Sequence, residues 1–363
     1  MKSARDLTRT FEPSGLTMAP PIEEPVYRSG GRGASVAAPD IAANRGFPLE
    51  TNDGRSGERM TDGIESPVAA REIQTRMFDS SRWDHVELRD DDIVVATWAK
   101  SGTTLTQQMV GQLISGGDDE VAFLGASPWV DVRFMMPLTD MVSMLDAQTH
   151  RRFMKTHLPF DAVPYSPSVK YIYIGRDARD VLWSVYNHCS SFTAAAWENI
   201  NAASGPWPKW SAPTTDVRQY YLDWLDSDVA PGFHDLSFWE HVQGWWDQRN
   251  RPNVLLLHYA NLVADLPGGM RRLAEFLDID IDEAKFPTMI ERCGIGYMRD
   301  QAAEAPFLKM MFEHGASSFF NKGTNGRWRD VLSPAEIARC DAVAADNLTP
   351  DCAHWLKTGE TAA

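Results

Sequence analysis

The sequence contains no long hydrophobic run. A membrane-spanning helix needs about eighteen or more consecutive apolar residues, and no such stretch occurs between Met1 and Ala363. The first residues, Met1 to Asp6, also lack the apolar segment of a secretory signal peptide. We therefore expect neither a membrane span nor export, and we predict a cytoplasmic protein.

Cysteine and positive charge are scarce as well. The four cysteines, Cys189, Cys293, Cys340 and Cys352, show no paired spacing, so we expect reduced thiols without a disulfide framework. Lysine and arginine number 35 against 50 acidic residues, which gives a net charge of −15. Because a nucleic acid backbone binds to a basic surface, this balance argues against nucleic acid as a partner.

The histidines show no spacing typical of a metal site. His234, His241 and His258 are scattered among apolar and aromatic residues, where core or surface roles are commoner than metal ligation. We therefore expect no bound metal.

Periodic patterns are missing from the front of the chain. Residues 1–65 are rich in proline and glycine, so we predict a disordered N-terminal extension followed by one domain over residues 66–363. In that domain, β-rich runs at 92–98, 169–175 and 253–258 alternate with helical patterns. The alternation predicts an α/β, P-loop-like three-layer fold with a central parallel sheet flanked by helices.

An anion-binding loop follows the first β-rich run. Lys100, Ser101, Gly102, Thr103 and Thr104 end an apolar strand and open a helix. The first amides of a helix have no intrahelical partner and carry the positive end of the helix dipole, so they favour phosphate or sulfate. The lysine adds a full charge and the hydroxyls add donors. An ordinary strand-to-helix turn is the alternative.

The loop is not a Walker A motif. Its lysine, Lys100, precedes its glycine, Gly102, whereas a Walker A lysine follows the glycine. A P-loop-type nucleotide kinase that uses ATP and Mg²⁺ is therefore the weaker alternative.

A second segment pairs a cation with an imidazole. Lys155 and His157 are two residues apart in the strand-like run 152–158, so both side chains leave the same face. Histidine suits a general base that removes a hydroxyl proton, because its ordinary pKa of about 6.5 lies near neutral pH. A structural histidine and a solvated lysine are the alternatives.

Two further segments carry basic side chains next to turns. Arg176 stands at the carboxyl end of the run 169–175, and Ser184 follows eight residues later, close enough for both to contact one anion. Pairing of Arg176 with a nearby aspartate is the alternative. Near the C-terminus, Lys322 and Gly323 begin a basic loop in which glycine permits movement.

Together these segments resemble the cytosolic-type sulfotransferase family, in the manner of a bacterial-like member. Four stretches match in family order, at residues 99–104, 155–159, 173–184 and 322–328, and the resemblance covers roughly residues 70 to 335. It implies an enzyme that transfers a sulfuryl group from 3′-phosphoadenosine 5′-phosphosulfate (PAPS) to a hydroxyl or amine. The product of the donor would be adenosine 3′,5′-bisphosphate (PAP).

The resemblance also implies a role for each matching residue. The donor-binding residues would be Lys100, Ser101, Gly102, Thr103, Thr104, Arg176, Ser184, Tyr259, Lys322 and Gly323. Of these, Arg176 and Ser184 would bind the 3′-phosphate. His157 would deprotonate the acceptor, while Lys100 and Lys155 would stabilise the developing negative charge.

Two positions depart from the family pattern. Asn321 stands where the family usually has arginine, which removes one charged phosphate contact unless another residue supplies it. Leu105 stands where the family usually has a tryptophan that stacks on adenine. These departures are the best support for another alternative, a non-catalytic protein that binds 3′-phosphoadenosine nucleotides.

The acceptor is expected to be a small, apolar molecule. Eight of the thirteen tryptophans lie between residues 183 and 246, and the interval around 205–213 is expected to cover an apolar pocket, with core packing as the alternative. By family-like placement, the pocket would be lined by Phe134, Met135, Met136, Cys293, Ile295 and Met298. The oligomeric state stays open, with a homodimer among the alternatives.

Overall fold

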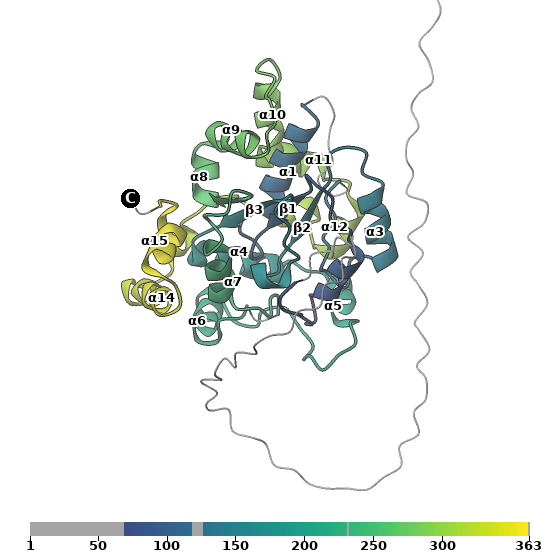
Figure 1. Cartoon of the computed structure of the whole chain (residues 1–363). Helices are drawn as coiled ribbons and strands as arrows, with labels where there is room; N and C mark the ends of the chain where they lie inside the picture. Colours follow the sequence, from purple (N-terminus) through teal and green to yellow (C-terminus); the bar gives the residue numbers. More distant parts are fainter. Residues whose placement is uncertain (1–68, 118–125, 231, 362–363) are drawn as a thin grey trace, which may run out of the picture. The chain divides into compact units, whose positions relative to one another are not determined.

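A parallel sheet forms the centre of the protein in the computed structural model, which describes residues 69–117, 126–230 and 232–361. The strand order is β2-β1-β3-β4, and β1, β2 and β3 are labelled at the centre of Figure 1. The strands are β1 (Ile93–Ala96), β2 (Phe153–Thr156), β3 (Lys170–Gly175) and β4 (Val254–His258). These strands confirm the three β-rich runs and the strand-like run that carries Lys155. The expected extension, residues 1–65, lies outside the described residues.

Alternate residues along the strands pack on opposite faces of the sheet. Val94 and Tyr173 belong to one cluster of buried apolar side chains, whereas Val95 and Ile174 belong to another. Burial of both faces explains why the strands read as almost continuous apolar runs. The predicted three-layer arrangement is therefore confirmed.

Helices cover both faces (Figure 1). One face packs against α1 (Thr103–Ile114), α8 (Tyr259–Ala264), α9 (Leu266–Phe276) and α10 (Phe286–Arg292). The larger cluster on the other face includes residues of α4 (Ala178–Ser190), α6 (Val217–Ser227), α7 (Phe238–Trp246), α14 (Pro334–Asn347) and α15 (Pro350–Thr358). It also includes residues of α3 (Leu138–Asp146), α5 (Ala194–Asn201), α11 (Ile295–Gln301), α12 (Pro306–Met311) and α13 (Ala316–Phe319). Short 3-10 helices are η1 (Ser80–His85), η2 (Phe160–Ala162) and η3 (Arg327–Asp330).

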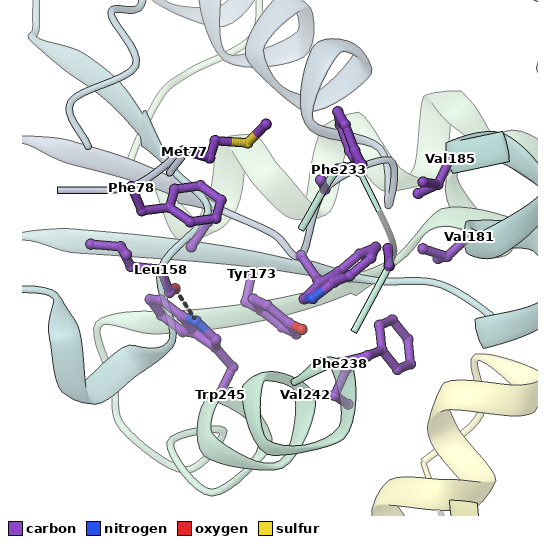
Figure 2. Packing of buried hydrophobic residues seen from close by; sticks show 14 of the residues in the cluster. Met77, Phe78, Leu158, Tyr173, Val181, Val185, Phe233, Phe238, Val242 and Trp245 are labelled. Carbon is purple, nitrogen blue, oxygen red and sulfur yellow. Dashed lines mark hydrogen bonds between the residues drawn. The ribbon is translucent and has the colours of Figure 1, made fainter. Parts of the chain in front are cut away.

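Aromatic packing ties α7 to the sheet (Figure 2). The rings of Tyr173 and Trp245 stack with centroids 5.2 Å apart and an interplanar angle of 5°. The indole of Trp245 also donates a hydrogen bond of 3.2 Å to the carbonyl of Leu158. These contacts hold Leu158, the residue after His157, against α7.

Side chains cap two of the helices. Asp177 caps α4 by accepting from the amide of Arg179, and Ser333 caps α14 in a reciprocal box with Glu336. Pro334 occupies the first turn of α14, where its missing amide hydrogen costs nothing. The first of these caps sets the direction in which α4 leaves Arg176.

The four cysteines are all buried and unpaired, in agreement with the expected free thiols. Within the described ranges, no helix combines the length and apolarity needed to cross a bilayer. The same residues contain no cluster of three or more histidine, cysteine or acidic side chains that could hold a metal ion.

Candidate active site

The carboxyl ends of the four strands bring the predicted site residues together. Lys100 lies shortly after β1, while His157, Arg176 and Tyr259 directly follow β2, β3 and β4. Ligands bind at this edge in open parallel sheets. The order of the strands therefore places residues from distant segments around one space.

That space is a cavity of about 450 Å³. The predicted donor-binding and catalytic residues that line it are Lys100, Gly102, Thr103, Thr104, Lys155, His157, Arg176, Ser184, Tyr259, Lys322 and Gly323. Ser101 is buried away from the cavity, and its amide donates to the carbonyl of Trp98 at 3.3 Å. The amide of Ser101 is therefore engaged elsewhere.

The loop before α1 is shaped to leave the first helix amides open. Gly102 is the N-cap residue with φ 127°, and no side chain caps the helix. A Cβ at Gly102 would lie 2.8 Å from the Tyr259 ring, so the backbone and this ring approach closely. Lys100 also has a positive φ of 66°, a left-handed backbone conformation that is uncommon for residues other than glycine.

His157 is held in one orientation. Its Nδ1 lies 2.8 Å from the carbonyl oxygen of Thr97, and because a carbonyl oxygen only accepts, Nδ1 carries the proton. The ring also meets Trp129 edge-on at 4.7 Å between centroids. Burial, with Lys155 nearby, holds the pKa of His157 well below its ordinary value. The imidazole is therefore neutral, with an unprotonated Nε2.

Lys155 lies over an aromatic face. Its Nζ is 4.3 Å from the centroid of the Trp129 indole, whose Nε1 donates to Asp131 at 2.9 Å. Asp131 also accepts from the backbone amide of His157 at 3.3 Å. Burial lowers the pKa of Lys155 to about 8, although Asp131 opposes this change. Asp131 therefore holds both the Trp129 indole and the backbone that follows β2.

Lys100 contacts a histidine that the sequence analysis did not single out. Its Nζ lies 3.1 Å from Nδ1 of His188 and 5.1 Å from the centroid of the Phe319 ring. Burial and the neighbouring Arg176 lower the pKa of Lys100 to about 7. A proton is thus held weakly on this amine.

Arg176 connects three segments of the site. Its guanidinium donates to the carbonyl of Lys100 at 3.0 Å and to Oδ1 of Asn325 at 2.8 and 3.1 Å. It also lies 4.3 Å above the ring of Tyr259, whose hydroxyl donates to the carbonyl of Gly323 at 3.3 Å. The expected alternative, an arginine paired with aspartate, describes Arg179 instead, which forms an ion pair with Asp177 at 2.6 Å.

The loop at 321–327 carries a basic side chain near the departure from the family pattern. Asn321 accepts at its Oδ1 from Arg327 at 3.2 Å, and Arg327 lines the cavity together with Lys322. The loop is tied to α4 because the amide of Gly326 donates to Asp180 at 2.6 Å. Leu105, the other departure, lines the cavity as well.

The electrostatics of the cavity favour an anionic ligand. Among the described residues, no carboxylate forms an ion pair within 4.0 Å of Lys100, Lys155 or Arg176. Burial lowers the pKa of all three groups, although Asp131 opposes this change at Lys155 and Asp180 and Asp177 oppose it at Arg176. A phosphate or sulfate group would add negative charge close to these cations, so these residues fit a polyanionic donor.

The rest of the cavity wall is aromatic and apolar. Five of the six expected acceptor-side residues line it, and Met136 does not. Further apolar lining residues are Met77, Trp129, Phe192, Phe233, Phe307, Met311, Phe312, Phe319 and Phe320.

The expectation for the tryptophan-rich interval is wrong. Of the eight tryptophans between residues 183 and 246, all of them described, only Trp183 lines the cavity. Residues 205–213 do not line it either. Instead, Arg76 donates to the carbonyls of Trp207 and Pro208 at 2.5 and 2.9 Å, and the Trp207 ring carries Arg133. Packing against other segments of the same protein therefore explains the tryptophans of this interval.

Comparison with known proteins decides the family. The sulfotransferase domain matches residues 90–350, which is most of the chain. The chain belongs to the sulfotransferase family. A glycolipid sulfotransferase of Mycobacterium bovis (strain BCG / Pasteur 1173P2) is 32% identical over 317 residues, with 81% of this chain and 97% of the relative covered. This member is accordingly a PAPS-dependent sulfotransferase.

Other relatives are more distant. Sulfotransferase 1B1 of Canis lupus familiaris is 26% identical, with 73% of this sulfotransferase and 86% of the relative covered. Retinol dehydratase, solved in complex with androsterone and the inactive cofactor PAP, has a TM-score of 0.59 at 23% identity. That comparison covers 74% of this chain and 84% of the other. It agrees with the α/β sulfotransferase fold.

Sequence reasoning missed His188, Trp129, Asn325 and Arg327. His188 stands one helical turn after Ser184 on α4, so its place beside the predicted anion contacts could have been read from helical spacing. Trp129 precedes Asp131 by two residues but belongs to no recognised motif. Its contacts with Lys155 and His157 depend on tertiary packing alone.

Proposed function

We propose that this sulfotransferase transfers the sulfuryl group of PAPS to a hydroxyl, or an amine, of a small apolar acceptor, with His157 as the general base. The observation that carries the proposal is the fixed, neutral imidazole in a cavity that is also lined by two partly buried lysines. Its Nε2 can accept a proton from an acceptor hydroxyl at neutral pH.

The donor side of the site is the more polar side. Amides of Gly102, Thr103 and Thr104 would bind the 5′ end of PAPS, since no side chain caps α1. Arg176, Ser184, Lys322 and Gly323 would surround the 3′-phosphate, and Tyr259 would lie beside the adenine. PAPS supplies an activated sulfuryl group and a bisphosphate leaving group.

Two lysines provide charge stabilisation in this proposal. Lys100 and Lys155 line the same cavity as His157, so positive charge lies where negative charge develops during transfer. The low-dielectric surroundings that lower their pKa values also strengthen their attraction for that negative charge. His157 holds the acceptor proton while the lysines act on the transferring group.

The apolar wall supports an apolar acceptor. Phenylalanine and methionine side chains dominate the lining away from Arg176. A curated relative is described as a glycolipid sulfotransferase, and the retinol dehydratase structures hold androsterone or retinol. These names favour an apolar alcohol, phenol or lipid for this enzyme too.

The family assignment opposes both alternative functions. A P-loop-type kinase would belong to another family, and a non-catalytic nucleotide-binding protein would have no use for His157 beside Lys155. Neither alternative has an observation in its favour beyond Leu105 and Asn321.

The donor is tested by calorimetric titration of the protein with PAP and, separately, with ADP, without added metal. We expect a clear preference for PAP, because the 3′-phosphate meets Arg176 and its neighbours. Equal affinity for the two nucleotides would contradict the assignment of the 3′-phosphate site.

The base is tested with His157→Ala, assayed with radiolabelled PAPS against a panel of apolar phenols, alcohols and lipids. We expect turnover to fall by roughly 10²- to 10⁴-fold, while PAP binding stays within about threefold of the wild type. His150→Ala, at an exposed histidine outside the cavity, is the matched control. Joint loss of turnover and PAP binding would show that His157 is structural.

A further inference from the structure

The cavity is lined by a second histidine, to which the proposed function gives no role. His188 lies on α4, one turn beyond Ser184, and it lines the cavity. Its Nδ1 lies 3.1 Å from Nζ of Lys100. This distance suits a hydrogen bond that the amine donates and the ring nitrogen accepts.

The ring of His188 is fixed by aromatic neighbours. Its centroid lies 4.9 Å from Phe192, 5.1 Å from Phe233, 4.8 Å from Phe312 and 5.9 Å from Phe319. These rings come from different segments of the chain, so the imidazole cannot turn freely. Nδ1 is thereby held at a constant position beside Lys100.

The position of the Lys100 amine depends on its contact with His188. Within the described residues, the His188 ring is the hydrogen-bond partner that the structure gives to its Nζ, and no carboxylate lies within 4.0 Å of it. The other charged or titratable groups around the amine are Arg176 at the start of α4, Cys189 on α4 and Lys155 on β2. Both cations repel the ammonium, and the buried thiol stays protonated because its pKa is raised.

We propose that His188 is a positioning residue for Lys100: it accepts a hydrogen bond from the amine, keeps it protonated and directs it into the cavity. This inference rests on the proposed function, because it assigns Lys100 to the transferring group. It also predicts the tautomer of His188, with the proton on Nε2. The two cavity histidines are then complementary, since His157 carries its proton on Nδ1.

Burial is consistent with that arrangement. It holds the pKa of His188 well below the ordinary value, with Lys100 as the next largest cause, so the ring stays neutral and can accept. A charged imidazole could not accept from an ammonium.

Two substitutions separate the hydrogen bond from the packing. His188→Phe keeps an aromatic ring among the four phenylalanines but removes the acceptor. His188→Asn loses ring contacts but places an amide oxygen near the position of Nδ1. A structural role predicts that the phenylalanine variant is the better enzyme, whereas the positioning role predicts the reverse. Thermal unfolding of both variants checks that each is folded.

The first readout does not depend on activity. The rate at which Lys100 reacts with a small acylating reagent, followed by peptide mass spectrometry between pH 5 and 10, gives the titration of its amine. We expect the midpoint to fall by about one pH unit in His188→Phe, because an ammonium hydrogen bond is lost, and to stay near the wild-type midpoint in His188→Asn. An unchanged midpoint in His188→Phe would overturn the proposal.

The second readout is turnover of PAPS with 2-naphthol as the probe acceptor. We expect kcat in His188→Phe to fall by roughly 10- to 100-fold, with KM for PAPS within about threefold of the wild type, and His188→Asn to recover most of the loss. A higher KM for PAPS with unchanged kcat would contradict the positioning role. Better activity in His188→Phe than in His188→Asn would contradict it as well. Failure of the proposed function would look different, because wild-type protein would then not prefer PAP over ADP.

Discussion

At the residue scale, the charges of the site determine when the enzyme can work. His157 must be neutral to act as a base, and Lys100 and Lys155 must be protonated to stabilise negative charge. Burial moves the pKa values of all three groups downward. Burial therefore keeps His157 neutral down to a lower pH than an ordinary histidine. It also makes the two lysines lose their protons at a lower pH than ordinary lysines.

The pH profile of kcat/KM for PAPS should show this asymmetry. Since kcat/KM reports the free enzyme, we expect it to be maximal below neutral pH and to fall as the pH rises through about 7 and 8, where Lys100 and Lys155 lose their protons. A bound polyanion raises lysine pKa values, so the fall in kcat should come at higher pH. Measurement from pH 5.5 to 9.5 checks both curves. A plateau that extends to pH 9 in kcat/KM would contradict the burial argument.

Arg327 is expected to replace the cation that Asn321 lacks. It lines the cavity and donates to Asn321, so its charge lies beside the loop assigned to the 3′-phosphate. We predict that Arg327→Ala weakens PAP binding by roughly tenfold, with a smaller salt dependence. Arg329→Ala is the matched control, because that arginine packs on Trp328 and does not line the cavity. Calorimetry at two salt concentrations compares them. Equal losses in both variants would refute the specific role of Arg327.

The residue scale is also where sequence reasoning had its limits. Lys100, His157 and Arg176 could be predicted because each stands in a short motif next to a strand end. His188 could not be paired with Lys100 in the same way, since 88 positions separate them and only the tertiary fold brings them together. Arg327 was missed because the sequence does not show that its side chain lies at the cavity, which depends on how the loop at 321–327 folds.

At the element scale, the turn between β1 and α1 packs against Tyr259, so in the proposed function it would couple donor binding to that ring. Gly102 has a φ of 127°, and a Cβ there would press on the Tyr259 ring at 2.8 Å. That ring carries Arg176 on its face and donates to Gly323. A shift of the tyrosine would thus disturb two other parts of the donor site.

We predict that Gly102→Ala weakens PAP binding by at least about tenfold and destabilises the fold by roughly 1–3 kcal/mol. Gly116→Ala is a matched control, because Gly116 also has a positive φ, of 61°, but nothing lies within 4 Å of the added Cβ. We expect this control to lose stability and to keep its affinity for PAP. Calorimetry and urea unfolding of both variants give the two quantities. If Gly102→Ala binds PAP like the control, contact with Tyr259 is unimportant.

The elements themselves were largely predictable. The strands β1, β3 and β4 lie in continuous apolar runs, and α14 begins at a capping box of Ser333 and Glu336, a pattern that the sequence alone displays. The tryptophan-rich stretch was interpreted wrongly, because composition shows that aromatics must be buried but not against what. Here Trp245 and Trp224 pack in the core, and Trp207 packs beside Arg133.

At the scale of the whole molecule, buried neutral histidines make stability depend on pH. Burial lowers the pKa of His241 to about 3, and its Nδ1 lies at hydrogen-bond distance, 3.2 Å, from the Tyr173 hydroxyl. The unfolded chain has a histidine pKa near 6.5. As the pH falls below that value, the unfolded state takes up the proton first, so stability is lost on acidification and is fully present above it.

Replacing His241 with asparagine isolates this contribution. The asparagine amide can still hydrogen-bond to the Tyr173 hydroxyl but does not titrate. We predict that the stability of the wild type relative to His241→Asn falls by about 1.4 kcal/mol per pH unit between roughly pH 6.5 and 3. Urea unfolding at pH 7.5, 6.0 and 5.0 measures the difference, and the comparison cancels the effect of the chain's net charge. A difference that is independent of pH would show that His241 is not buried neutral.

The crowding of cations at the carboxyl ends of β1, β2 and β3 has a consequence for the amount of folded enzyme. Among the described residues no carboxylate forms an ion pair with Lys100, Lys155 or Arg176, so bringing these cations together opposes folding, and a bound polyanion reduces that opposition. By mass action, a ligand at about one hundred times its dissociation constant adds about 2.7 kcal/mol to stability. A cell that runs short of PAPS and PAP would then hold this chain in a less stable state, open to proteolysis. Supply of the donor would govern how much enzyme persists as well as how fast it works.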